Sequence, residues 1–221
     1  MKRDDRLTQD MSKVEVKGIE AKYYDILMNI LTLGKYPSFI RKALRQTALK
    51  EGERVLDMGC GSGRNALLIR EMIGESGSYT GLDIGREMID GFRKRCGGFD
   101  NMEILDMHID STLAFEEEFD AVLVSFVLHG FVQEKRDTII KNAYRALKKG
   151  GVFNIVDYSN FVVDDAPLPV RFAIRKMECP LAEDFIRRDT KEMLSAFGFD
   201  SFEEYFHFGG YVRVLRAHKG E

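Results

Sequence analysis

The chain has 221 residues; 44% are apolar, and 33 Lys or Arg residues against 36 Asp or Glu residues give a formal charge of -3. A chain of this length is expected to form one α/β domain and to bury enough surface to fold without a disulfide or metal. The balanced charge contains no Lys/Arg-rich run, which argues against nucleic acid as a partner. No apolar run approaches the roughly 18 residues of a transmembrane segment.

The cysteines and the first residues indicate a compartment. Cys60, Cys96 and Cys179 are widely spaced and form no C-x-x-C pair, which predicts neither zinc nor disulfides and fits a reducing cytoplasm. The start, MKRDDRLTQD, lacks the apolar segment of a signal peptide, so residues 1–19 are expected to be a flexible tail. We therefore predict a cytoplasmic protein with a single domain over residues 1–221. The oligomeric state cannot be read from these patterns.

Strand-like and helix-like segments alternate along the chain, with no repeat or interdomain linker between them. Residues 21–33 and 38–49 predict two helices, which would form an N-terminal helical cap over residues 20–50. After this cap, the expected strands are 54–58, 79–83, 102–105, 119–126 and 152–158, and the expected helices are 65–73, 86–95, 134–147 and 190–197.

The last third of the chain adds two features. Residues 160–180 hold three of the four prolines and predict a loose segment that caps the substrate side. Residues 202–208 and 211–217, joined by a pair of glycines, predict a closing antiparallel hairpin. With the five earlier strands, this predicts an α/β fold: a seven-stranded, mostly parallel sheet with helices on both faces. Ligands of such sheets bind beyond the carboxyl ends of the strands.

A glycine loop follows the first strand, with the pattern D-x-G-x-G-x-G from Asp57 to Gly63. The dinucleotide fingerprint, G-x-G-x-x-G/A, would need a small residue where this chain has Arg64. Asp57 lies two residues before the first glycine, where its charge would repel a pyrophosphate. The loop therefore favours a positively charged ligand and argues against a nicotinamide-dependent oxidoreductase, the first rival interpretation.

A second carboxylate supports this interpretation. Asp83 ends the second strand and lies 20 residues beyond Gly63 (83 minus 63), the spacing at which an acid can accept hydrogen bonds from a ribose diol. A nucleoside with a ribose and a cationic, amino-acid-like arm would satisfy both Asp57 and Asp83. S-adenosylmethionine has these features, and it is the cofactor that the two acids predict.

Four segments in order, VLDMGCGSGRNALLI, GLDIGREMI, FDAVLVSFVLHGF and ALKKGGVFNIVDYS, resemble the successive motifs of class I S-adenosylmethionine-dependent methyltransferases. The resemblance covers about residues 20–218 and implies a Rossmann-like fold. Within that superfamily the chain looks most like the ubiquinone/menaquinone biosynthesis C-methyltransferase group. The segment YYDILMNILTLGKY and the ending AFGFDSFEEYFHFGGYVRVLRAHKG add to that likeness.

The resemblance implies that the glycine loop lines the methionine moiety, that Asp83 holds the ribose, that Ile84 packs on adenine, and that Ser125 lies near the methionine end. After the third strand, Asp106 and His108 are both candidates for contact with the adenine amine. The predicted cofactor positions are Asp57, Gly59, Cys60, Gly61, Ser62, Asp83, Ile84, Met107, His108 and Ser125. For Cys60 itself, filling a small space is the favoured role, because methyl transfer needs no enzyme nucleophile.

The expected reaction is an in-line displacement, in which an acceptor atom attacks the sulfonium methyl group and S-adenosylhomocysteine leaves. His129, Tyr158 and Asp157 lie at strand ends and are the catalytic candidates for proton removal; their order of importance stays open. The predicted substrate-binding residues are Tyr23, Tyr24, His129 and His207. No metal is expected to take part.

The acceptor is expected to be a small molecule, with C-methylation of a quinone-like precursor as the favoured reaction. The acidic stretch VVDDAPLP weakens the quinone assignment more than the assignment of the methyl donor. A quinone acceptor would bring the enzyme into contact with a membrane surface. N- or O-methylation of another metabolite is an alternative, and a catalytically silent, methyltransferase-like binding module is a further one.

Overall fold

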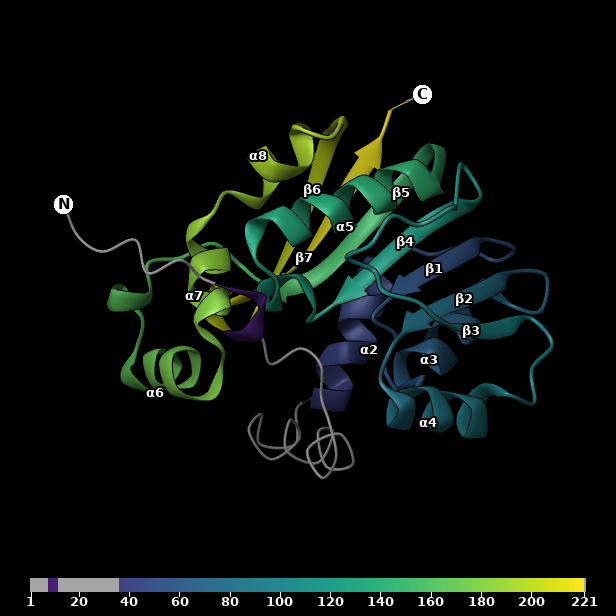
Figure 1. The fold of residues 1–221 in the computed structure, drawn as a ribbon, viewed down its shortest axis with the longest axis horizontal. Coiled ribbons are helices and arrows are strands. Elements are labelled where there is room, and N and C mark those ends of the chain that lie inside the picture. The colour runs from purple at the N-terminus through teal and green to yellow at the C-terminus, as the bar shows by residue number, and fades with distance from the viewer. Residues whose placement is uncertain (1–7, 12–35, 221) are drawn as a thin grey trace.

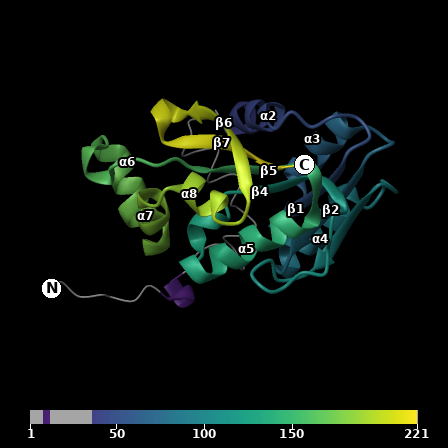
Figure 2. The ribbon, with the colours of Figure 1, turned by 90° about the horizontal axis from the view of Figure 1, so that it is seen from above.

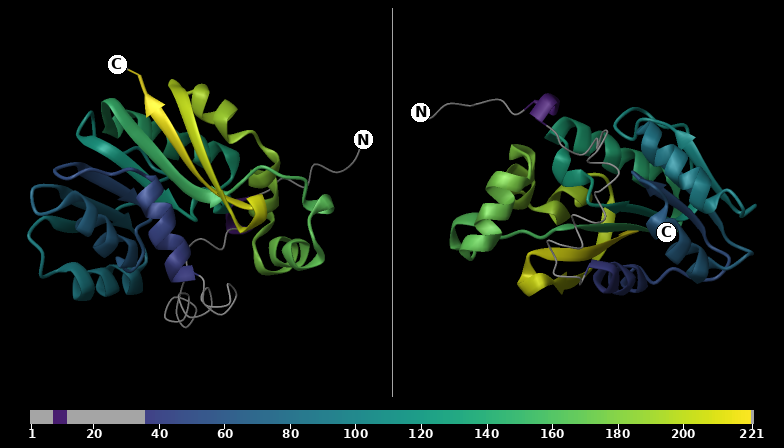
Figure 3. Two further views of the ribbon diagram at one scale, coloured as in Figure 1. Left: turned by 180° about the vertical axis from the view of Figure 1, so that it is seen from behind. Right: turned by 90° about the horizontal axis from the view of Figure 1, so that it is seen from below.

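The computed structural model describes residues 8–11 and 36–220 (Figure 1). Seven strands form one sheet in the order β3-β2-β1-β4-β5-β7-β6. The strands are β1 (Arg54–Met58), β2 (Ser78–Asp83), β3 (Met102–Asp106), β4 (Phe119–Ser125), β5 (Leu147–Tyr158), β6 (Phe199–His207) and β7 (Val212–Lys219). Strand β7 is antiparallel to both of its neighbours, and the other pairs are parallel. The hairpin of β6 and β7 forms one edge of the sheet, and β3 forms the other (Figure 3).

Helices cover both faces of this sheet, and Figure 2 shows α2 and α5 on opposite sides of it. The α-helices are α2 (Tyr36–Gln46), α3 (Arg64–Ile73), α4 (Arg86–Cys96), α5 (Gln133–Ala146), α6 (Leu168–Phe172), α7 (Pro180–Arg187) and α8 (Thr190–Ser195). The shorter helical turns are η1 (Gln9–Met11), η2 (Leu128–Gly130), η3 (Val163–Asp165), the π-helical η4 (Ala173–Met177) and η5 (Phe208–Gly210).

The central strands are apolar on both faces, and this is why the sheet can be covered twice. In β1, Leu56 packs in a core with α5 and α8, whereas its neighbour Val55 packs in a second core with α2, α3 and α4. Strand β4 alternates in the same way, with Val122 in the first core and Leu123 in the second. Successive side chains of a strand point to opposite faces, so a continuous apolar run requires two covering layers.

The predicted fold class is confirmed: the sheet has seven strands, is mostly parallel and closes with an antiparallel hairpin. Residues 160–180 are the main difference from the expected elements. They are not simply loose, because η3, α6 and η4 lie within them and α7 begins at Pro180. The predicted helix at residues 21–33 lies outside the described residues, whereas the second part of the predicted cap is α2.

The carboxyl ends of the parallel strands face α6 and α7 (Figure 1). The chain leaves β1 for a helix on one face and leaves β4 for a helix on the other, so the strand order reverses between these two neighbours. Such a reversal is where ligands bind in open parallel sheets. In the part of the chain that the structure describes, no helix is both long and apolar enough to cross a membrane.

Candidate active site

The glycine loop turns tightly after β1, and three of its residues have backbone angles that suit glycine. Gly59, Gly61 and Gly63 have φ values of 89°, 56° and 78°. A Cβ atom on Gly59 would lie 2.7 Å from Val127, and one on Gly63 would lie 2.6 Å from Phe92. A Cβ atom on Gly61 would meet only Met88, at 3.9 Å. Two of the glycines therefore allow protein packing, whereas the third leaves space at the loop surface for a ligand.

Asp83, at the end of β2, holds this loop in place. Its Oδ2 atom accepts a hydrogen bond from the Gly61 backbone amide at 2.9 Å. Its Oδ1 atom accepts from the backbone amides of Ile84 and Gly85, at 2.9 and 2.8 Å. A carboxylate offers about four acceptor positions, so Asp83 keeps room for about one further donor. The acid predicted to bind ribose therefore also connects the loop after β1 to the loop after β2.

Asp57, at the end of β1, is a buried carboxylate with one unsatisfied oxygen. The side chain is 1% exposed, and its Oδ2 atom accepts a hydrogen bond from the Tyr79 hydroxyl at 2.7 Å. Its Oδ1 atom is buried without a hydrogen-bond partner. Burial raises the pKa of Asp57 from 3.8 to about 7; the Tyr79 hydrogen bond opposes this shift, and the Asp83 charge adds to it. A cation at this position would stabilise the carboxylate.

The other predicted cofactor positions differ in how they face the loop. The Cys60 side chain is buried against Gly81 of β2, so only the backbone of Cys60 can contact a ligand. Met107 donates its backbone amide to the Asp83 carbonyl at 3.3 Å, which places the loop after β3 beside the end of β2. The His108 side chain is 63% exposed. Asp106 is exposed as well, so both candidates for the adenine amine remain accessible.

The predicted catalytic residues come together at the ends of β4 and β5. His129 in η2 places its Nδ1 atom 2.8 Å from Asp157 Oδ1, and its Nε2 atom 3.6 Å from Glu178 Oε2. The Tyr158 hydroxyl donates to Glu178 Oε1 at 2.7 Å, and the Tyr158 ring lies edge-on to His129 with centroids 5.1 Å apart. Glu178 was absent from the sequence-based set, because it lies in the segment expected to be loose.

The charge of His129 follows from its two acidic neighbours. Burial alone would lower the pKa of His129, but ion pairing and hydrogen bonding with Asp157 and Glu178 outweigh burial and raise it from 6.5 to about 10. The imidazole is therefore protonated near neutral pH, with both ring nitrogens as donors. A protonated ring cannot accept a proton, so this arrangement argues against His129 as a general base.

A row of aromatic rings extends from this cluster to His207. Phe126 lies 6.2 Å from Tyr158 and 6.2 Å from Phe39, measured between ring centroids, and Phe39 lies 5.0 Å from His207. Phe126 follows Ser125 with a φ of 55°, a strained value for a residue with a large side chain. His207 bonds Gln46 through Nε2 at 2.7 Å. Tyr23 and Tyr24, the other predicted substrate contacts, lie outside the described residues.

Arg136 of α5 joins the turn that carries His129 to α7, and the sequence analysis did not identify it. The side chain is 0% exposed. Its Nε atom donates to the Leu128 carbonyl at 3.1 Å, and its Nη2 atom donates to the Leu181 carbonyl at 2.8 Å. Its Nη1 atom pairs with Asp184 at 2.6 Å. The sequence analysis also missed α7, the partner helix of Arg136. The apolar spacing of PLAEDFIR, with proline at the start of the helix, is the signal from which α7 could have been predicted.

These features define a class of protein. The chain is a Rossmann-like α/β protein whose candidate site lies at the carboxyl edge of the sheet, over the glycine loop and the ends of β2, β4 and β5. Among the residues that the structure describes, no group of three or more His, Cys, Asp or Glu side chains could hold a metal ion.

Comparison with known proteins shows which proteins the chain is similar to. Residues 55–151 match a family model described as a methyltransferase domain. The chain is 28% identical over 156 residues to the ubiquinone/menaquinone biosynthesis C-methyltransferase UbiE of Xanthomonas campestris pv. campestris, which covers 68% of this chain and 60% of that protein. It is 31% identical over 149 residues to the chloroplastic 2-phytyl-1,4-beta-naphthoquinone methyltransferase of Arabidopsis thaliana, which covers 63% of this chain and 54% of that protein.

The fold is also similar to that of a solved structure. The structure resembles that of a SAM dependent methyltransferase from Aquifex aeolicus with a TM-score of 0.60 and 21% identity, over 81% of this chain and 88% of that chain. Residues 55–151 match the methyltransferase domain model, and the resemblance to methyltransferases predicted from the sequence is confirmed. The chain spans about 60% of the length of the first UbiE relative.

Proposed function

We propose that the chain is an S-adenosylmethionine-dependent methyltransferase that acts on a small-molecule acceptor in the cytoplasm. The main support is Asp57 Oδ1, an oxygen that is buried without a hydrogen-bond partner two residues before the glycine loop. The ammonium group of the methionine arm would supply both the missing hydrogen bond and the compensating charge. The methyltransferase domain and the similar fold of a SAM dependent methyltransferase support the same donor.

The side chains around the loop divide the work of binding. When bound, S-adenosylmethionine supplies a methyl group on a sulfonium, which an acceptor atom attacks in line. Asp57 would hold the ammonium group, Asp83 would accept a hydrogen bond from the ribose, and Gly61 would leave space for the ligand. The main contribution of the protein would be to align donor and acceptor and exclude water from them, which can lower a barrier by several kcal/mol.

On the acceptor side, His129 and Glu178 would act on a developing charge and a proton, and Asp157 and Tyr158 would position them. The Asp157 carboxylate fixes the orientation of His129 through the 2.8 Å bond to Nδ1. The two N–H groups of the protonated His129 ring face Asp157 and Glu178, so the ring would stabilise an oxyanion on the acceptor through its positive charge. Glu178 is the carboxylate proposed to take a proton. In this assignment Glu178 is the general base, and Tyr158 positions Glu178 through the 2.7 Å hydrogen bond.

For the acceptor we favour a quinone-like precursor that is methylated at carbon. The names of the two relatives refer to ubiquinone, menaquinone and a naphthoquinone, and the row of aromatic rings next to His129 would pack well against a flat ring. Such an acceptor would bring the protein to a membrane surface. N- or O-methylation of another metabolite is the first alternative, and binding without turnover is the second alternative.

Calorimetry tests the donor. We expect S-adenosylmethionine and S-adenosylhomocysteine to bind the wild-type protein, and Asp83→Ala to weaken binding by roughly 1 to 3 kcal/mol. Asp100→Ala, an exposed acid in the turn before β3, is the matched control and should change little. If neither compound binds at millimolar concentration, the proposed function is wrong. If Asp83→Ala binds like wild type, the ribose lies elsewhere.

Methyl uptake tests the acceptor. The protein is incubated with S-adenosylmethionine carrying a labelled methyl group and with hydroquinone, phenol and amine acceptors. Labelled carbon on a hydroquinone ring would support the favoured reaction, whereas label on oxygen or nitrogen would support the alternative. Donor binding with no transfer to any acceptor would support the silent binding module.

A further inference from the structure

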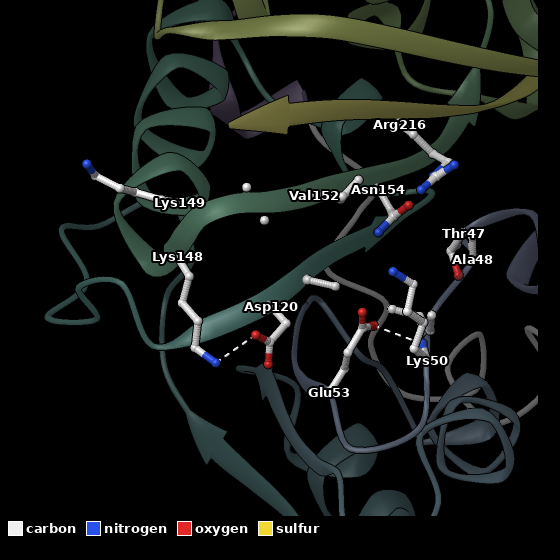
Figure 4. Close-up of a pocket in the computed structure, with 14 residues that line it drawn as sticks. Thr47, Ala48, Lys50, Glu53, Asp120, Lys148, Lys149, Val152, Asn154 and Arg216 are labelled. Carbon is white, nitrogen blue, oxygen red and sulfur yellow. Dashed lines mark hydrogen bonds and ion pairs between the residues drawn. The ribbon is translucent and has the colours of Figure 1, made fainter. Parts of the chain in front are cut away.

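A pocket of about 180 Å³ lies at the amino edge of the sheet, opposite the glycine loop (Figure 4). Its walls come from the turn after α2, the residue before β1, the start of β4, the first half of β5 and Arg216 of β7. Helix α2 covers the adjoining part of this sheet face with Ala43 and Leu44, and it ends at Gln46. The pocket lies where this cover stops, so side chains of β5 and β7 form its floor.

The floor of the pocket holds an unusual share of unsatisfied polar atoms. Among the described residues, seven buried side-chain nitrogen or oxygen atoms lack a hydrogen-bond partner, and three belong to Asn154 and Arg216 in this pocket. Asn154 is 1% exposed, and both atoms of its carboxamide are unpartnered. An Asn154–Arg216 hydrogen bond would satisfy only the Asn154 oxygen and leave the Nδ2 donor without an acceptor. Each such atom destabilises the folded protein unless a ligand or ordered water meets it.

The charge of the walls indicates which ligand would do so. Four cationic side chains and two acids line the pocket, but Arg216 is paired with Glu203 at 2.8 Å and Figure 4 shows Lys149 directed away from the space. The acid Glu53 accepts the Lys50 backbone amide at 3.0 Å.

The other acid, Asp120, already accepts the Lys148 ammonium at 2.6 Å and the Arg54 backbone amide at 2.8 Å. Figure 4 shows the Lys50 amine and the Asn154 carboxamide directed into the same space. The groups that remain to meet a ligand are therefore mainly donors.

We propose that this pocket binds a small phosphate group, either hydrogen phosphate or a phosphate monoester. The phosphate oxygens would accept from Asn154 Nδ2, Arg216 Nε and the Lys50 ammonium, and a hydroxyl of the ligand would donate to Asn154 Oδ1. A singly protonated phosphate offers both kinds of group near neutral pH. The pocket lies at the far end of β1 from the glycine loop, so its ligand binds independently of the proposed methyl transfer.

The test is a titration of the wild-type protein with inorganic phosphate. Binding is monitored through the NMR signals of the Asn154 side-chain amide and of the Gly150 and Gly151 backbone amides. We expect saturable shifts at these three groups and none at Gly59 to Gly63. Lys50→Gln should weaken phosphate binding roughly tenfold, because it removes one charge-assisted hydrogen bond. Lys141→Gln, which removes an exposed charge on α5 outside the pocket, is the matched control and should stay within about twofold.

Asn154→Leu removes the unpartnered amide and should abolish the phosphate response. If this variant does not fold, Lys50→Gln decides alone, because Lys50 is exposed and its loss does not threaten the core. The proposal fails if wild type shows no saturable shift, if the shifts occur only at the glycine loop, or if Lys50→Gln binds phosphate like wild type. Acetate is the probe for carboxylates; acetate binding as tight as phosphate binding would overturn the assignment to phosphate.

Discussion

The two halves of the carboxyl edge are built in different ways. In the glycine-loop half, residues 57–85, one acid accepts three backbone amides within a short stretch of chain. In the cap half, residues 125–189, side chains distant in sequence hold the site: His129 meets Asp157 and Glu178, and Arg136 meets Asp184. The first half is therefore a local structure that glycine spacing specifies, whereas the second depends on tertiary packing.

The largest effect that separates the two halves is expected from Arg136→Met. The variant removes a buried guanidinium, leaves the Leu128 and Leu181 carbonyls without this donor and leaves Asp184 with Arg188 alone, so unfolding free energy should fall by about 3 to 5 kcal/mol. Urea unfolding measures this loss. Arg145→Met, on the same helix and paired with the exposed Glu116, is the matched control and should cost less than about 1 kcal/mol.

Hydrogen exchange on the Arg136 variant tests the comparison itself. Amides of residues 128–132 and 180–187 should lose protection, whereas amides of Gly59 to Gly63 should keep theirs. An equal loss in both halves would contradict the view that they are held independently.

Two glycines of the loop give the next largest effect. Gly63→Ala should destabilise the fold by about 2 to 3 kcal/mol, because the added carbon would lie 2.6 Å from the buried Phe92 and φ is 78°. Gly61→Ala meets nothing closer than 3.9 Å and should cost only about 1 kcal/mol of backbone strain. Gly61→Ala should nevertheless weaken S-adenosylmethionine binding. For Gly61→Ala, the loss of binding should be larger in proportion to the loss of stability than it is for Gly63→Ala. Thermal unfolding and calorimetry on both variants measure these differences, and equal destabilisation would contradict the division of roles.

Asp57→Asn should stabilise the protein and weaken donor binding. Because the pKa of Asp57 is raised from 3.8 to about 7, the folded state holds a proton that the unfolded state releases, and stability falls as the pH rises from about 4 to 7. Asparagine stays neutral, so the variant should gain about 2 kcal/mol over wild type at pH 8 and little at pH 4. Urea unfolding at both pH values checks this; an equal gain at both would show that ionisation is not the cause.

His129 should give a smaller effect in a higher pH window. Its pKa is raised from 6.5 to about 10, so its contribution to stability is complete below pH 6.5 and is lost as the pH rises toward 10. The advantage of wild type over His129→Gln should shrink by about 1 kcal/mol or more between pH 7 and 10. Unfolding curves of the two proteins across this range measure the difference. A constant difference would mean that the acidic pair does not hold His129 in its charged form.

The difference between the halves explains what could be predicted. The pattern from Asp57 to Gly63 and the acid at position 83 were found because both are fixed by short spacings along the chain. Residues 160–180 were expected to be loose because of their prolines, yet Pro180 begins α7, where Leu181 and Phe185 are buried. The roles of Glu178 and Arg136 were not predicted. No local sequence pattern shows that a charged residue has a buried partner 40 or more residues away.

By itself, the sequence determined the alternation of strands and helices, the turn after β1, and the two acids at the ends of β1 and β2. These depend on periodicity and on the backbone angles of glycine, which act over a few residues. Only the tertiary structure decided which polar groups meet: the oxygen of Asp57 left without a partner, the two acids that keep His129 protonated, and the buried Asn154 amide that lines a pocket where α2 ends. Burial and long-range contacts create those properties, and the local spacing of residues along the chain determines neither of them.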